Sequence, residues 1–193
     1  YINPHVTFYF RPEVHMVSEE GLNAYGAVTW GQFFVYQGFN EHCGWMHTSC
    51  NVDVADVYRE KVSRQNGKLV YAYNGKQRAV AERKVTVRMK DGGSKVFTTY
   101  ATHHGPVMAV REGEYVTVKS VNRSLNGLLQ SWLRTKARGL EDFKKTMDYR
   151  SNASNNTVYA DRFGNIAYWH GNFVPLRDRQ FDWSKPVDGT TAA

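Results

Sequence analysis

Hydrophobic and polar residues alternate over much of this chain, which is the period of a β-strand with one buried face. Between positions 59 and 101, Asn-Gly and Asp-Gly-Gly sequences typical of tight turns separate the alternating segments. Residues 1–37 are rich in aromatic residues and are interrupted by prolines, so extended segments and loops are expected there. The pattern predicts a β-meander and one further strand, over 69–73, 85–89, 96–100 and 116–121.

The period changes between Asn126 and Met147, where apolar residues recur every three or four positions. This spacing predicts helices, and Gly139 divides the region into two short ones. Basic residues near the end of the first helix suit the C-terminal end of a helix dipole. We expect the apolar stripes to lie in the core; they consist of Leu128, Leu129, Trp132, Leu133, Leu140, Phe143 and Met147.

A β-hairpin is predicted between Ser154 and Arg177. Strand-forming residues flank the turn sequence Asp-Arg-Phe-Gly-Asn, in which Gly164 can adopt a positive φ. Asn156 enters the first strand, and Arg177 follows the second. On its own, this pattern also fits a surface hairpin whose Asn caps a turn.

Composition narrows the classes of protein. The 193 residues suffice for one full core or two small ones, and no apolar run is long enough to span a membrane. The net charge of +7 is spread over presumed strands and helices, so nucleic-acid binding has only charge to support it, and we expect none. Cys43 and Cys50 lack a zinc-binding pattern; they could pair if their strands meet, but two buried thiols are expected. Tyr1 follows neither an initiator Met nor a signal-peptide pattern, which we interpret as the start of a piece of a longer protein.

Several motifs occur in a fixed order along the chain. The hairpin reads Asn-Thr-Val-Tyr-Ala-Asp-x-x-Gly-Asn-Ile-Ala-Tyr, followed by Gly-x-x-x-Pro-x-Arg. Upstream are an Asn-Pro-His stretch ending at His5, a Gly-x-Asn-x-x-x-x-Trp-x-x-Thr stretch ending at Thr48, and a Thr-x-His-Gly-Pro-Val stretch that includes His104. Together these motifs resemble those of the penicillin acylase family of N-terminal nucleophile (Ntn) hydrolases.

The resemblance implies an α+β, β-rich fold: part of an αββα four-layer sandwich with two antiparallel sheets between helices. Residues 1–193 would be one partial domain of the acylase β-subunit, incomplete at both ends. The family cleaves the amide bond of N-acyl compounds such as penicillins and acyl-homoserine lactones. Its nucleophile is an N-terminal Ser, exposed by autoprocessing, whose α-amine acts as the base.

No residue of this chain matches the family's nucleophile. The α-subunit and the rest of the β-subunit would be the missing partners, and we expect this chain alone to be inactive. The resemblance further implies a periplasmic or secreted enzyme without an organic cofactor, acting on a small N-acyl amide.

The resemblance also implies roles for individual residues. The side-chain amide of Asn156 and the backbone N–H of Ser49 would bind the oxyanion of the tetrahedral intermediate. His5 would orient the α-amine of the nucleophile, and Arg177 would help to hold the active site together. His47 would face the acyl pocket, although a half-exposed strand histidine fits the pattern equally well.

Two further motifs have both a structural and a functional interpretation. The alternation over residues 51–58 is that of a strand with one wet face. Yet Asp53, the carbonyl of Ala55 and Asp56 match the calcium ligands of the penicillin G branch of the family, and Ca²⁺ prefers such oxygen ligands. His104 is expected to be structural, with its imidazole hydrogen-bonded to buried backbone, and a catalytic role is the less favoured alternative.

The alternative from another class is a non-catalytic β-rich domain that binds peptides or glycans through exposed Tyr and Trp residues. The ordered motifs would then be coincidental. The resemblance to the acylases is therefore the interpretation we prefer.

Overall fold

The computed structural model describes residues 5–7, 9–171 and 173–191. By their internal packing, these residues form two compact units. Unit 1 contains the described residues within 1–54 and 121–174, and unit 2 contains those within 55–120 and 175–191.

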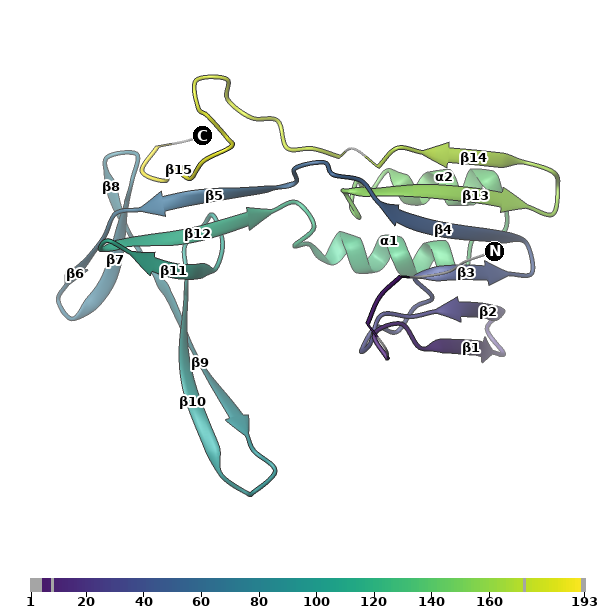
Figure 1. Cartoon of the computed structure of the whole chain (residues 1–193), viewed down its shortest axis with the longest axis horizontal. Coiled ribbons are helices and arrows are strands. Elements are labelled where there is room, and N and C mark those ends of the chain that lie inside the picture. Colours follow the sequence, from purple (N-terminus) through teal and green to yellow (C-terminus); the bar gives the residue numbers. More distant parts are fainter. Residues whose placement is uncertain (1–4, 8, 172, 192–193) are drawn as a thin grey trace. The chain divides into compact units, whose positions relative to one another are not determined.

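Unit 1 is built on a six-stranded sheet with the order β1-β2-β3-β4-β13-β14, in which every neighbouring pair is antiparallel (Figure 1). The hairpin predicted from the sequence is confirmed as β13 and β14. Strand β13 of the hairpin pairs with β4. The two strands are far apart in the chain, since the paired residues His47 and Thr157 are 110 positions apart. The strands are β1 (Glu13–Ser18), β2 (Leu22–Ala27), β3 (Gln37–Asn40), β4 (Cys43–Ser49), β13 (Asn155–Asp161) and β14 (Ile166–Trp169).

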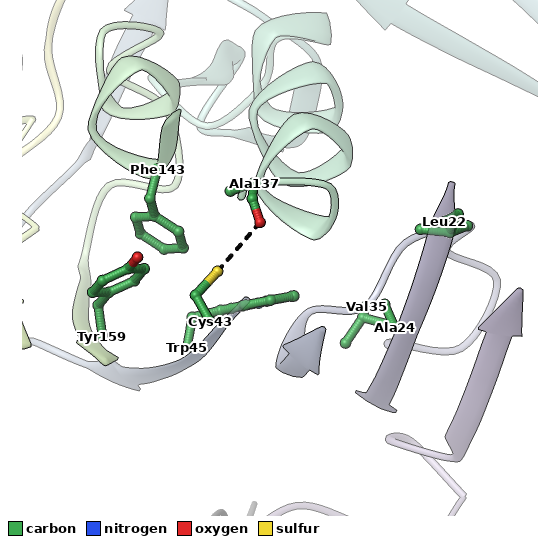
Figure 2. Packing of buried hydrophobic residues seen from close by; sticks show 8 residues of the cluster. All are labelled: Leu22, Ala24, Val35, Cys43, Trp45, Ala137, Phe143 and Tyr159. Atoms are coloured by element: carbon green, nitrogen blue, oxygen red, sulfur yellow. Dashed lines mark hydrogen bonds between the residues drawn. The ribbon is translucent and has the colours of Figure 1, made fainter. Parts of the chain in front are cut away.

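Two helices pack on one face of this sheet, as predicted: α1 (Leu125–Thr135) and α2 (Leu140–Met147) (Figure 1). Figure 2 shows the ring of Phe143 beside that of Tyr159, with 4.7 Å between their centroids. The thiol of Cys43 donates to the carbonyl of Ala137, which follows α1, at 3.5 Å. The core of unit 1 therefore lies between the helices and the sheet residues whose side chains point toward them.

The apolar stripe predicted for α1 faces the core only in part, because Trp132 packs against the core cluster. Leu128 and Leu129 are exposed, whereas Gln130, Ser131, Arg134 and Thr135 are buried. Gln130 and Ser131 follow the two leucines by two residues, which is about 200° around a helix, so they lie on nearly the opposite face. Two of these side chains have hydrogen-bond partners: the Gln130 side chain accepts from the backbone N of Ser151 at 3.0 Å, and the Thr135 hydroxyl donates to the Ser131 carbonyl at 2.8 Å. The fully buried Arg134 donates through Nη2 to the Ser131 hydroxyl at 3.2 Å, but its Nε and Nη1 have no partner among the described residues. For α2 the prediction holds, since Phe143 is fully buried.

Strands β2 and β3 approach each other closely at facing glycines. Gly26 and Gly38 are partners in the register, and a Cβ built on Gly38 would overlap the carbonyl oxygen of Tyr25. Only glycine fits this crossing without moving a strand. Cys43 is buried as expected, but Cys50 is only partly buried, and neither forms a disulfide.

Unit 2 consists of three small sheets. The strands of the predicted meander are confirmed, but they divide between a three-stranded and a two-stranded sheet. The Asn66-Gly67 and Asn74-Gly75 turns both have positive φ at both positions, as type I′ hairpin turns require. The sheets contain β11 (Val107–Arg111), β12 (Glu114–Ser120), β5 (Ala55–Glu60) and β15 (Val187–Asp188); β6 (Val62–Gln65), β7 (Lys68–Tyr73) and β8 (Lys76–Ala79); and β9 (Ala81–Arg88) with β10 (Ser94–Ala101).

Within the described ranges, neither helix has the length and apolar character of a membrane span.

Candidate functional site

A pocket of about 450 Å³ opens in unit 1 at the end of β4. Its lining includes His5, Arg11, Tyr36, His47 and Ser49. The pocket exists because β3 begins only at Gln37, and the β3–β4 register places that residue opposite Met46. The last residues of β4 therefore have no strand on that side. The structure thus brings together three of the residues that the sequence singled out: His5, His47 and Ser49.

The backbone N–H of Ser49 points away from β13, toward the pocket side of β4. In an antiparallel ladder, residue pairs that exchange hydrogen bonds alternate with pairs that do not. Cys50 N donates to Ser154 O at 2.8 Å, so the adjacent pair, Ser49 and Asn155, is of the second kind. The Ser49 N–H is therefore directed at the edge of β4 that β3 does not cover.

His47 is buried, with only 4% of its surface exposed, so the half-exposed alternative is wrong. Its Nδ1 lies 2.9 Å from the Thr157 hydroxyl, and its Nε2 is buried with no partner among the described residues. Burial, with added repulsion from Arg134 and Arg11, holds the pKa of His47 well below its usual value. The ring is therefore neutral at physiological pH, and it contributes an uncharged wall to the pocket.

Asn156 lies on β13 directly opposite Thr48, the residue before Ser49. Its side-chain Oδ1 accepts a hydrogen bond from His170 Nδ1 at 2.6 Å. Sequence reasoning missed His170. The hairpin register could have found it, because the pairing of Thr157 with Trp169 places residue 170 opposite residue 156.

In unit 2, Arg177 forms an ion pair with Asp56, whose carboxylate Oδ1 accepts from Arg177 Nε at 2.8 Å. The Asp56 side chain is 5% exposed and the Arg177 side chain 19%, so the pair is largely shielded from water. The Arg177 guanidinium also lies 5.9 Å from the ring centroid of Trp183. The sequence had given these two residues separate roles, in metal binding and in organising the site.

The oxygen donors expected for calcium fall in different units, since Asp53 belongs to unit 1 and both Ala55 and Asp56 to unit 2. Asp53 is exposed, and Asp56 is buried against Arg177. Among the described residues, no group of three or more His, Cys, Asp or Glu side chains gathers as a metal site would require. The donor chemistry of carboxylates and a carbonyl still suits Ca²⁺, but a cation at Asp56 would share that carboxylate with Arg177.

His104 is buried as expected, but its partner is a carboxylate and not backbone. Its Nδ1 lies 2.9 Å from Oε1 of Glu60, which is fully buried. The same oxygen accepts from the hydroxyls of Thr102 at 2.6 Å and Thr117 at 2.9 Å. Burial opposes ionisation of Glu60, but the hydrogen bonds from these three side chains outweigh it and hold the Glu60 pKa below its usual value. All three donors are gathered on Oε1 of this buried carboxylate, whereas Oε2 has no hydrogen-bond partner among the described residues.

Comparison with known proteins decides the family. The family model described as penicillin amidase matches residues 2–193, almost the whole chain. This chain belongs to the penicillin amidase family. It is 28% identical over 182 residues to penicillin G acylase of Escherichia coli, covering 88% of this chain and 21% of that protein. It is 35% identical over 85 residues to the acyl-homoserine lactone acylase QuiP of Pseudomonas fluorescens, covering 44% of this chain and 10% of that protein.

The fold agrees with a solved member of the family. The thermostable penicillin G acylase from Alcaligenes faecalis superimposes with a TM-score of 0.76 at 26% identity, over 94% of this chain and 33% of that one. The predicted α+β, β-rich fold with antiparallel sheets is thereby confirmed. The chain spans about a fifth of the length of the E. coli relative.

Proposed function

We propose that this chain supplies the oxyanion-binding and acyl-pocket part of an N-acyl amide hydrolase. The observation that carries the proposal is the end of β4, where the Ser49 N–H turns away from β13 beside a pocket lined by His5 and His47. The carboxamide of Asn156 lies opposite the neighbouring residue of the same strand. One backbone donor and one side-chain amide at adjacent ladder positions are the elements of an oxyanion hole.

In this proposal, the hydroxyl of an N-terminal Ser outside residues 1–193 attacks the amide carbonyl while its own α-amine takes the proton. The carbonyl oxygen becomes an oxyanion, which accepts hydrogen bonds from Ser49 N–H and Asn156 Nδ2–H. Collapse of this intermediate expels the protonated amine and leaves an acyl ester, and water then releases the carboxylic acid. His5, which is among the lining residues of the pocket, would orient the α-amine.

Two relatives give the substrate classes to test, since their names specify penicillin G and acyl-homoserine lactones. The neutral His47 ring and the side chain of Met46 give the pocket uncharged walls, and the Arg11 side chain adds a cation to the same lining. The acylase would act in the periplasm or outside the cell and would include an α-subunit and the rest of the β-subunit.

Arg177 has a supporting role in this proposal. By pairing with Asp56 it keeps a buried carboxylate neutralised within unit 2, and so maintains the segment that follows the hairpin. A structural calcium ion bound by Asp53, Asp56 and the Ala55 carbonyl is a separate proposal, supported by the oxygen chemistry of those groups.

The experiment is hydrolysis by the complete, processed acylase that contains this chain. Phenylacetyl amides and acyl-homoserine lactones of several chain lengths are supplied, and the released acid is measured by chromatography. We expect at least one class to be hydrolysed, and no release by residues 1–193 alone because they lack the nucleophile. A processed acylase that releases no acid from any N-acyl amide, or turnover by residues 1–193 alone, would overturn the proposal.

A further inference from the structure

We propose that His170 is a positioning residue, which fixes the carboxamide of Asn156 with its NH₂ group directed at the oxyanion. This inference rests on the proposed function and adds a residue that no motif had indicated. It is carried by the 2.6 Å contact between His170 Nδ1 and Asn156 Oδ1.

The contact has a defined polarity. The oxygen of an asparagine side chain only accepts hydrogen bonds, and its nitrogen only donates them. His170 Nδ1 must therefore carry the proton, and the Asn156 oxygen must face His170. The NH₂ group then points the other way. Rotation of the carboxamide by half a turn would give up this bond and present the oxygen to the developing negative charge, so the His170 bond selects the productive orientation.

The backbone around His170 is held in place by a close approach of strands. Ser154 N donates to the carbonyl of Gly171 at 3.1 Å, and a Cβ on Gly171 would overlap the carbonyl oxygen of Asn155. The two residues that flank the His170–Asn156 pair are therefore in backbone contact. The rings of Tyr168 and His170 are nearly parallel, at 18°, with centroids 6.4 Å apart. The close strand contact at Gly171 therefore fixes the backbone next to His170, and the Tyr168 ring lies alongside the imidazole.

The test uses two substitutions of similar shape at this exposed position. His170→Leu removes the donor, and His170→Asn restores one, because the asparagine Nδ2 occupies nearly the same place as the histidine Nδ1. We expect His170→Leu to lower kcat of the processed acylase about tenfold with little change in KM, since the lost orientation matters mainly in the transition state. His170→Asn should recover kcat to within about threefold of the wild-type value.

A double-mutant cycle with Asn156→Ala separates positioning from general structure. Once the Asn156 carboxamide is gone, there is nothing for His170 to orient, so His170→Leu should change kcat less than about twofold in that background. The matched control is His15→Leu, which removes the same type of bond, from His15 Nε2 to Asn23 Oδ1 at 2.8 Å, on strands β1 and β2. That variant should keep normal kcat.

The outcomes distinguish the inference from the function on which it rests. An unchanged kcat in His170→Leu, no recovery in His170→Asn, or additive losses in the double mutant would each overturn the role of His170 while leaving Asn156 as the donor. A normal kcat in Asn156→Ala would overturn both. If His170→Leu fails to autoprocess, His170→Phe, which keeps an aromatic ring without the donor, takes its place in the cycle.

Discussion

Two buried carboxylates in unit 2 are each held by a basic side chain from a distant part of the chain. Glu60 is hydrogen-bonded by His104, and Asp56 is ion-paired with Arg177, at sequence separations of 44 and 121 residues. A buried carboxylate that loses its partner keeps the cost of leaving water, whereas an exposed pair loses little. Removing only the basic partner of either carboxylate should therefore lower the free energy of unfolding.

Removing His104 tests this directly. His104→Ala leaves the fully buried Glu60 with only its two threonine donors, and we expect a loss of about 3–5 kcal/mol in the free energy of unfolding. Lys144→Ala is the control, since it breaks an exposed ion pair with Glu141 and should cost less than about 1 kcal/mol. Urea unfolding followed by circular dichroism measures both. Equal small losses would contradict the account of Glu60.

The pH dependence has a defined sign. The folded state depresses the pKa of Glu60 below the usual 4.5, so the stability that Glu60 contributes is present above pH 4.5 and is lost as the pH falls through the folded value. His47 also lowers the stability of the folded state as the pH falls below 6.5, the usual pKa of histidine. Below that pH the unfolded chain binds a proton at His47 that the buried, neutral ring does not bind. We expect the melting temperature to fall from about pH 6.5 toward acid. Glu60→Gln should remove the part of this fall below pH 4.5, and an unchanged profile would contradict that assignment.

At the scale of elements, strands β2 and β3 approach each other closely where Gly26 faces Gly38. Gly38→Ala places a methyl group on the Tyr25 carbonyl, and we expect a cost of about 1–3 kcal/mol or more because two strands must separate. Gly44→Ala is the matched control on β4, where the new Cβ would meet Phe39 at an ordinary 3.5 Å. It should be neutral or slightly stabilising, since alanine restricts the unfolded chain. A similar effect of both substitutions on the urea midpoint would contradict the packing described.

Local signals in the sequence were sufficient to predict most elements. The Asn-Gly turns and the interruption at Gly139 specify backbone geometry within a few residues, so the hairpins and both helices appear where expected. The buried face of α1 could not be predicted this way. Polar residues occupy it, and the partner of one of them, Gln130, is the distant backbone N–H of Ser151; hydrophobic periodicity carries no such information.

The same distinction holds for the candidate site. Motifs identified His5, Ser49 and Asn156, but the pocket depends on where β3 begins and on the pairing of β4 with β13, which is long-range. His170 lies within the predicted hairpin, but no motif marks it, and only the pairing of Thr157 with Trp169 connects it with Asn156. The partners of His104 and Arg177 could not be inferred, because nothing local connects either residue with its carboxylate.

On the scale of the whole molecule, the described residues form one helix-covered sheet in unit 1 and three small sheets in unit 2. The face of the unit 1 sheet away from the helices carries exposed apolar side chains: Tyr25, Phe39, Val158 and Tyr168. Such a face is what a second sheet covers in a layered sandwich.

Calcium binding is tested at this scale, in the complete acylase. In the complete acylase we expect Ca²⁺ to raise the melting temperature, by an amount that corresponds to about 2.7 kcal/mol at a hundredfold excess over Kd. Asp53→Asn should abolish the shift while leaving the Asp56–Arg177 pair intact. A calorimetric titration that shows neither heat nor a melting shift with Ca²⁺ would remove the metal from the account.

The central claim is that Asn156 and Ser49 bind the oxyanion, and the steady-state kinetics of Asn156→Ala in the processed acylase test it most directly. Losing one such donor costs about a hundred- to a thousandfold in kcat, and KM should change much less. Ser49→Ala should stay near the wild-type kcat, because its proposed donor is backbone and survives the substitution. Autocleavage is checked separately on a gel. A near-normal kcat for Asn156→Ala together with a large loss for Ser49→Ala would contradict both assignments.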